Sequence, residues 1–394
     1  MNRHGRHIGL TGRQVNHLKH STLPAFKLSG SMKIGFIIYG SLDTVSGGYL
    51  YDRKLVEYLR TQGDTVEIIS LPWRNYAAHL MDNLRFRLPR DFDLIIEDEL
   101  NHPSLILANR KPHPCPVISL VHHLRYSELR PKWQNNLYRV IEKIYLQSVD
   151  GFIFNSKTTR GVVQGLIGNG KPSILAYPPT DRFGSAVSEE EIREKAKISE
   201  LRILFLGNVI HRKGLHTLLK ALVQVERDGT ASYRLDVVGG LSAEPQYAYE
   251  MERYMLTHHL SSKVRFHGTL DHQPLIERYK HAHILAVPSS YEGFGIVYLE
   301  GMGFGLPAIG TTAGAASEII THGENGYLIK PDDVVKLAKH LKELANDREL
   351  LVRLSLNATK RYRSQPKWDE TAENIKGFLS RIAGANSHSL LPKA

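Results

Sequence analysis

The chain alternates short apolar runs with longer amphipathic segments, and this alternation restricts its fold more than any other feature. A first series of apolar runs predicts strands over 34–39, 65–71, 93–97, 117–121, 151–155 and 173–176, and a second series predicts strands over 201–206, 233–238, 264–267 and 284–287. The segments between them predict helices, among them 48–60, 131–148, 214–225 and 246–259. Continuous apolar strands that alternate with helices are typical of parallel sheets covered on both faces. The sequence therefore predicts an α/β fold with two parallel sheets.

The length of 394 residues exceeds what one hydrophobic core usually supports. We predict a basic disordered extension over 1–31, a Rossmann-like domain over 32–180, a linker over 181–200 without regular structure, and a second Rossmann-like domain over 201–365. The tail 366–384 has apolar residues at helical spacing, so it predicts a C-terminal helix. The helix over 131–148 is expected to present one apolar face, formed by Trp133, Leu137, Val140, Ile141 and Ile144.

Composition restricts the class of protein. The chain is 42% hydrophobic and 23% charged, and it has no apolar run near the ~20 residues that span a bilayer. Without an apolar segment at the N-terminus we expect no signal peptide, and therefore a cytoplasmic protein. The net charge of +11 leaves peripheral contact with an anionic membrane as a candidate, while no nucleic-acid-binding module accompanies the charge. Cys115 is the single cysteine, which argues against a disulfide or a cysteine-ligated metal.

A glycine-rich segment follows the predicted strand 284–287. Glu292 lies in the loop, Gly295 opens a helix that runs to about Phe304, and Glu300 lies one turn into that helix. A helix start directs free N–H groups at an anion, and carboxylates accept hydrogen bonds from hydroxyls. The combination favours a sugar nucleotide, with a plain helix start carrying surface acids as the alternative.

A second anion site is predicted after the strand 201–206. Gly207 and Asn208 form a turn, and Arg212 and Lys213 precede the next helix. A helix start beside two cations suits a phosphate, although a basic loop that merely caps a helix has the same sequence. Since both motifs follow strands of one predicted parallel sheet, we expect them at the same sheet edge.

The spacing from Glu292 to Glu300 resembles the Glu-x7-Glu motif of retaining family-four glycosyltransferases, which have the two-domain GT-B fold. Gly305-Leu-Pro-Ala-Ile309, Ser317-Glu-Ile-Ile320 and His322-Gly-Glu-Asn-Gly326 continue the family pattern in order. The resemblance covers about 32–378 and is strongest in the second half. It implies two Rossmann-like domains facing across a cleft, with the last helix returning to the N-terminal domain, which would bind the acceptor.

The resemblance also assigns residues. The catalytic residues that it implies are His122, Arg212, Lys213 and Glu292, and the donor-binding residues are Gly47, Gly48, Asn208, Gly268, Phe294, Gly295, Ile296, Val297 and Glu300. Arg212 and Lys213 would stabilise the leaving diphosphate, Glu292 would hold the donor sugar, and Glu300 the ribose. His122 would contact sugar and acceptor, although a lone histidine at a strand end is more often structural. The segment Asn155-Ser-Lys-Thr-Thr159 resembles a family turn that could be structural only.

Two positions depart from the family pattern. Asn208 stands where an arginine is common, and His123 stands where an aspartate is usual. The first departure leaves open which cation dominates at the diphosphate.

The sequence thus predicts a retaining glycosyltransferase that moves a sugar from a nucleoside-diphosphate sugar to a glycan, lipid or small-molecule acceptor. No cofactor and no metal are expected, because Arg212 and Lys213 can neutralise the diphosphate. The acidic runs 91–93 and 97–99 are interpreted as a turn and strand rather than as metal ligands. The alternatives are a GT-B sugar-nucleotide epimerase and a sugar-nucleotide-binding protein without catalysis.

Overall fold

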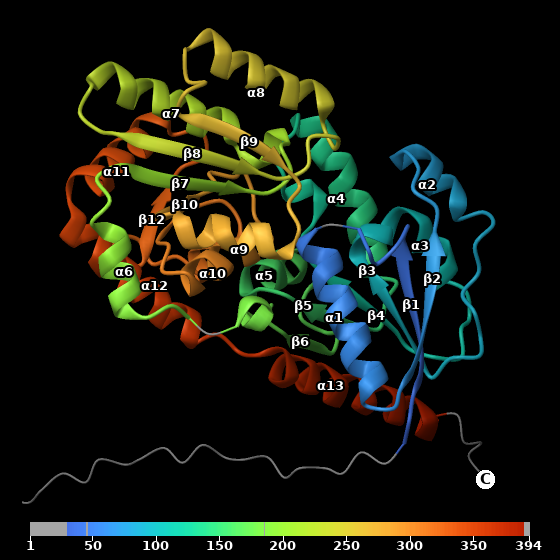
Figure 1. Cartoon of the computed structure of the whole chain (residues 1–394). Coiled ribbons are helices and arrows are strands. Elements are labelled where there is room, and N and C mark those ends of the chain that lie inside the picture. The colour runs from blue at the N-terminus through green and yellow to red at the C-terminus, as the bar shows by residue number, and fades with distance from the viewer. Residues whose placement is uncertain (1–29, 45, 185, 390–394) are drawn as a thin grey trace, which may run out of the picture. The chain divides into compact units, whose positions relative to one another are not determined.

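A computed structural model describes residues 30–44, 46–184 and 186–389 (Figure 1). Nearly all of the predicted extension 1–31 lies outside the described residues. Two six-stranded sheets, parallel throughout, organise the chain, which confirms the α/β prediction.

The first sheet belongs to the N-terminal domain. Its strand order is β2 (Thr65–Leu71), β1 (Lys33–Tyr39), β3 (Leu94–Asp98), β4 (Val117–Val121), β5 (Gly151–Phe154) and β6 (Ser173–Leu175). Its helices are α1 (Gly47–Thr61), α2 (Tyr76–Asp82), α3 (His102–Asn109), α4 (Lys132–Leu146) and α5 (Lys157–Ile167). Ile34 and Phe36 of β1 point into one apolar cluster and Ile37 into another, because successive side chains of a strand face opposite sides.

The second sheet belongs to the C-terminal domain. Its strand order is β12 (Gly326–Ile329), β11 (Ala308–Thr311), β10 (Ile284–Ala286), β7 (Leu201–Leu206), β8 (Tyr233–Val238) and β9 (Val264–Gly268). Its helices are α7 (Leu215–Asp228), α8 (Pro245–Thr257), α9 (His272–His281), α10 (Ile296–Gly303), α11 (Val334–Asn346) and α12 (Arg348–Arg363). One continuous cluster of buried side chains surrounds this sheet.

The last helix, α13 (Trp368–Ser389), packs on the first domain rather than the second. Figure 1 shows it in red beside the blue α1. Ile375 and Leu379 are buried in the same cluster as Ile34 and Phe36. Lys376 Nζ lies 3.0 Å from the carboxylate of Asp64, a second tie to this domain.

The prediction of an irregular linker over 181–200 is wrong in part. Residues Glu189–Ala196 form α6, which begins with a capping box between Ser188 and Glu191. The helix is highly charged, so it shows only Ile192 and Ala196 as an apolar pair, and these pack against Val352 of α12. A capping box supplies hydrogen bonds to free amides at a helix start, which helps a helix this short to form.

The predicted apolar face of α4 is largely exposed. The helix forms, but Trp133, Leu137 and Val140 are 67%, 50% and 57% exposed. The buried side of α4 carries Glu142 and Tyr145 instead. Glu142 is buried because its carboxylate accepts hydrogen bonds from the backbone amides that precede the helix, at 2.5 and 3.1 Å.

Within the described residues, no helix combines the length and the apolar character that crossing a bilayer requires.

We expect Leu379→Ala to lower the free energy of unfolding by about 2–5 kcal/mol, because it empties a fully buried site between α13 and β1. Urea denaturation followed by circular dichroism measures the change. Glu373→Ala, an exposed position of the same helix, is the control and should shift stability by less than about 0.5 kcal/mol. Equal stability of the two variants would show that the packing of α13 on the first domain does not stabilise the chain.

Candidate active site

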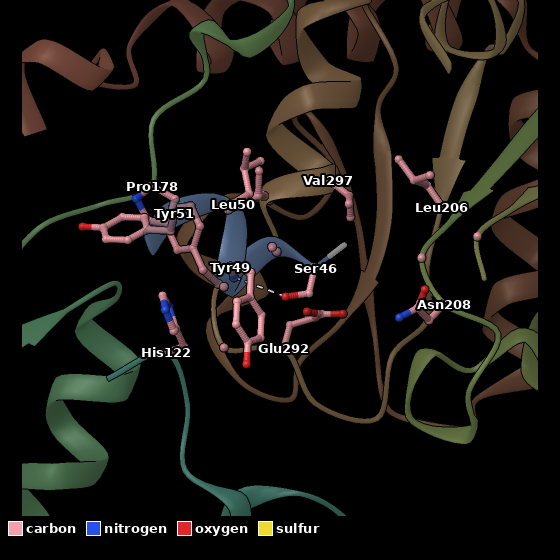
Figure 2. A pocket seen from close by; sticks show the side chains of 18 of the residues that line it. Ser46, Tyr49, Leu50, Tyr51, His122, Pro178, Leu206, Asn208, Glu292 and Val297 are labelled. Carbon is pink, nitrogen blue, oxygen red and sulfur yellow. Dashed lines mark hydrogen bonds between the residues drawn. The ribbon is translucent and has the colours of Figure 1, made fainter. Parts of the chain in front are cut away.

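A cavity of 570 Å³ lies where the carboxyl ends of the two sheets meet. Of the thirteen site residues predicted from the sequence, twelve line it. The exception is Gly268, which does not line the cavity, whereas its neighbour Thr269 does. Figure 2 shows His122 of the N-terminal domain and Glu292, Val297 and Asn208 of the C-terminal domain around this hollow. Residues from distant parts of the sequence therefore share one site.

Glu292 is the centre of a buried charge cluster. Lys213 Nζ lies 2.5 Å from its Oε1, Ser289 Oγ donates to the same oxygen at 2.6 Å, and Arg212 Nη1 lies 3.9 Å from Oε2. Burial opposes ionisation of Glu292, but the positive charges of Lys213 and Arg212 outweigh it and lower the pKa of Glu292 to about 2. Glu292 is thus a carboxylate with two cations beside it.

The turn that carries these cations is held against the Glu292 loop. Residues His211–Lys213 form a short 3-10 helix, and Arg212 Nη1 donates to the Tyr291 carbonyl at 2.8 Å. Gly214 ends the turn in the left-handed region at φ +74°, where a Cβ would lie 2.2 Å from the Pro288 carbonyl oxygen. Only glycine allows this approach, so Gly214 fixes how near the cations come to Glu292.

The N-terminus of α10 opens onto the same cavity. Gly295 precedes it at φ +98°, a conformation that glycine adopts readily. Phe294, Ile296 and Val297 all line the cavity. The free amides of this first turn carry partial positive charge, so they add to the attraction that Arg212 and Lys213 exert on an anion.

Gly47 and Gly48 begin α1 between the two domains. A Cβ at Gly48 would lie 3.2 Å from the His122 ring, and one at Gly47 would lie 3.8 Å from Ile296. Asn208 lies across the cavity, where its Oδ1 accepts a hydrogen bond from Gly240 N at 3.3 Å. Asn208 therefore shapes the turn and does not supply the charge of an arginine.

Glu300 has two partners that the sequence did not indicate. Tyr279 OH donates to its Oε2 at 2.8 Å, and Arg182 Nη1 lies 3.0 Å from its Oε1. Arg182 lies in the predicted linker and lines the cavity. A ligand hydroxyl that donates a hydrogen bond to Glu300 would therefore contact a carboxylate that already binds Tyr279 and Arg182.

His122 is paired with an aspartate that sequence reasoning missed. Its Nε2 lies 2.9 Å from Oδ1 of Asp52, a fully buried residue of α1 whose other carboxylate oxygen has no hydrogen-bond partner. Burial alone would lower the pKa of His122, but Asp52, followed by Asp98 and Glu99, raises it to about 9. The imidazole is therefore held as a cation at neutral pH.

The acidic runs 91–93 and 97–99, which we did not interpret as metal ligands, pair with protein groups. Asp91 pairs with Lys33 at 2.6 Å, and Glu97 accepts a hydrogen bond from Asn109 at 3.0 Å. Among the described residues, two groups do bring ligand atoms within 4.8 Å of one another: Asp52, Asp98 and His122, and Glu99, His102 and Glu142. Asp52 and His122 already bond to each other, so the first group has an internal partner for its imidazole.

Comparison with known proteins finds a family match in the C-terminal part of the chain. Residues 188–361 match the model of glycosyl transferases group 1. Mycobacterium tuberculosis glycogen synthase is 24% identical over 275 residues, which are 69% of this chain and 64% of that protein. A GDP-mannose-dependent alpha-(1-6)-phosphatidylinositol monomannoside mannosyltransferase of the same species is 28% identical over 53% of this chain and 57% of its own length. The chain thus spans about three-fifths of these curated relatives.

Solved structures confirm the GT-B fold. Sucrose-phosphate synthase from Thermosynechococcus elongatus superposes with a TM-score of 0.74 at 20% identity, over 90% of this chain and 99% of that one. HepE from Anabaena superposes with a TM-score of 0.68 at 19% identity, over 89% and 99%. The two parallel sheets are the two domains of that fold.

We predict that Asp52→Asn lowers the pKa of His122, because it removes the strongest charge that favours the imidazolium. In the native protein the stabilisation from this pair is complete below pH ~6.5 and is lost as the pH rises through about 9. NMR titration of the His122 ring should find it protonated at pH 8 in the native protein and neutral in the variant.

The control is Glu57→Gln, an exposed carboxylate of the same helix, which should leave the His122 titration unchanged. A native His122 that is already neutral at pH 7 would refute the pairing.

Proposed function

We propose that this chain is a retaining glycosyltransferase that transfers a sugar from a nucleoside-diphosphate sugar to a glycan, lipid or small-molecule acceptor, without a metal. The observation that carries the proposal is the convergence of Lys213, Arg212 and the α10 N-terminus around Glu292, opposite His122, in one cavity. Glycosyl transfer needs a group that stabilises the leaving diphosphate and a group that holds the sugar. Both kinds of group are present here.

The positive groups act on the phosphate. As the bond from the anomeric carbon to the diphosphate breaks, negative charge builds up on the leaving oxygen. Arg212, Lys213 and the amides at the start of α10 are held in place before the reaction, so they stabilise that charge without reorganising. A side chain that does so replaces the role that a divalent cation plays in other transferases.

The carboxylates act on hydroxyls. Glu292 retains a free lone pair on Oε2, since its Oε1 takes the bonds from Lys213 and Ser289. It is therefore suited to accept a hydrogen bond from the donor sugar, and Glu300 from the ribose. The acceptor would enter from the His122 side and attack on the face that the diphosphate leaves, which retains the anomeric configuration.

Two sugar nucleotides are the first donors to test. HepE has been solved with UDP and glucose and with UDP-glucose, and the mannosyltransferase relative is named for GDP-mannose. A bound donor raises the melting temperature in proportion to RT ln(1 + [L]/Kd). Product analysis with the stabilising donor then tests transfer: release of nucleoside diphosphate that depends on acceptor supports the proposal, and a stabilising donor without any turnover supports a binding protein.

An epimerase remains the second candidate, because one observation favours it. Asp98 and Glu99 line the same cavity, and burial raises the pKa of Asp98 to about 8 and that of Glu99 to about 7. Groups that titrate near neutral pH can serve as acid and base in an elimination. An isomeric sugar formed without any acceptor would identify this activity.

We expect Arg212→Ala to lower kcat by on the order of 10²–10³-fold, as loss of an electrostatic stabiliser usually does, with a smaller effect on KM. Steady-state rates of nucleoside-diphosphate release measure it. The control is Lys220→Ala, an exposed cation of α7, which should turn over at the native rate. Native turnover in both variants would remove Arg212 from the mechanism.

Chelation is expected to leave transfer intact, since side chains and helix amides neutralise the diphosphate. The rate is compared before and after excess EDTA, with magnesium returned at the end. Activity that disappears with EDTA and returns with magnesium would show that the reaction needs a metal.

A further inference from the structure

The exposure of α4 adds three apolar side chains to the surface of the N-terminal domain. Eleven large apolar side chains are exposed within the described residues, and eight of them lie between Trp73 and Val140. Trp133, Leu137 and Val140 are spaced four and three residues apart, so they form one stripe along the helix. Leu129, 66% exposed, precedes the helix. Soluble domains usually bury such a stripe, so its exposure indicates a surface that binds another molecule or a membrane.

A basic stripe runs beside the apolar one. Lys132, Arg139 and Lys143 are exposed and repeat at seven and four residues. Lys132 directly precedes Trp133, and Arg139 directly precedes Val140. The sole acidic residue between 129 and 147 is Glu142, which is fully buried. The exposed charges of this segment are therefore all positive. We call the exposed side chains of Leu129, Lys132, Trp133, Leu137, Arg139, Val140 and Lys143 the α4 surface.

The opposite side of α4 is firmly anchored, so the surface is not a product of loose packing. Tyr145 is buried and donates a hydrogen bond to Ser119 of β4 at 3.0 Å. Tyr138 packs edge-to-face against Tyr76 with ring centroids 4.9 Å apart, and the Arg125 guanidinium lies 5.0 Å from the Tyr138 ring. Rotating the helix to bury Trp133 would break these contacts.

We propose that the α4 surface docks on an anionic lipid bilayer. A tryptophan and aliphatic side chains beside lysine and arginine match a membrane interface, where the rings sit at headgroup level and the cations meet lipid phosphates. The charge pattern excludes the obvious rivals. A second copy related by a two-fold axis would place like charges opposite each other, and residues 1–31 carry five Lys or Arg and no acid.

The binding is reversible and depends on anionic lipid. Each Lys or Arg close to an anionic bilayer strengthens binding by about fivefold, at about 1 kcal/mol per charge. Three such charges and three apolar side chains on four turns of helix hold a protein at the surface without inserting it. Salt at 1 M shortens the screening length to about 3 Å and is expected to release it.

Co-sedimentation of the full chain with vesicles tests the proposal, and no sugar donor is present, so the result is independent of the proposed activity. We expect binding to vesicles of phosphatidylcholine mixed with phosphatidylglycerol at low salt, and much weaker binding to phosphatidylcholine alone. Leu137→Ser should reduce binding by about tenfold. The triple variant Lys132→Ser, Arg139→Ser, Lys143→Ser should abolish the preference for anionic lipid.

The matched control is Leu256→Ser, which removes a leucine of comparable exposure, 60% against 50% for Leu137, from α8 of the C-terminal domain. It should bind vesicles as the native chain does, and thermal melting verifies that each variant is folded. An equal loss in Leu256→Ser and Leu137→Ser, or no sedimentation of the native chain with anionic vesicles, would overturn the proposal. Sedimentation velocity without lipid adds one further outcome: a native dimer that Leu137→Ser makes monomeric would show that the α4 surface is a self-interface.

Discussion

The site depends on one close approach between the two domains. Gly293 lies so near β4 that a Cβ on it would sit 2.4 Å from the His122 carbonyl oxygen. Ser156, the N-cap of α5, donates to the Gly293 carbonyl at 3.0 Å. Nearby, the carboxylate of Glu318 accepts from the Lys157 and Thr158 amides at 3.0 and 2.7 Å, so a side chain of one domain satisfies the first turn of a helix in the other. These contacts put His122 next to the loop that carries Glu292, and no side chain larger than hydrogen at position 293 would allow it.

Given that contact, the cavity has two walls of different charge. The C-terminal wall has Arg212, Lys213 and the α10 amides around one carboxylate. The N-terminal wall has Asp98 and Glu99 near the His122–Asp52 pair. Arg212, Lys213 and the partial positive charge of the α10 amides gather around Glu292, so a ligand anion beside them would be stabilised. Hydroxyls suit the acidic wall. A sugar nucleotide, the proposed donor, would therefore lie in the cavity with its diphosphate toward α10.

The sequence predicted the six strands of the first sheet, four of the six in the second and most of the C-terminal wall, because their signals are local; it did not predict β11 and β12. Continuous apolar runs identify parallel strands, and Glu292, Arg212 and Lys213 sit directly after strands whose ends share an edge. What it could not predict depends on distant pairing. Asp52 and His122 are 70 residues apart, and nothing in their spacing marks them as partners. The α4 pattern defined an apolar stripe but not which side meets the core, since Glu142 is buried by backbone amides outside the helix. The helix α6 could have been predicted, because Ser188 and Glu191 have the spacing of a capping box.

The cavity and the α4 surface meet at a single turn. Glu128 accepts from His123 at 2.9 Å, pairs with Arg130, and lies 3.8 Å from Nε of Arg212. Burial opposes ionisation, but His123, Arg212 and Arg130 lower the pKa of Glu128 to about 2, so the carboxylate stays charged. A diphosphate at Arg212 competes with this carboxylate for the guanidinium. Leu129, the first residue of the α4 surface, follows Glu128 directly. If a ligand in the cavity changes the affinity of the α4 surface for a bilayer through this turn, the bilayer changes the affinity of the cavity for that ligand by the same factor, because coupling between two sites is reciprocal.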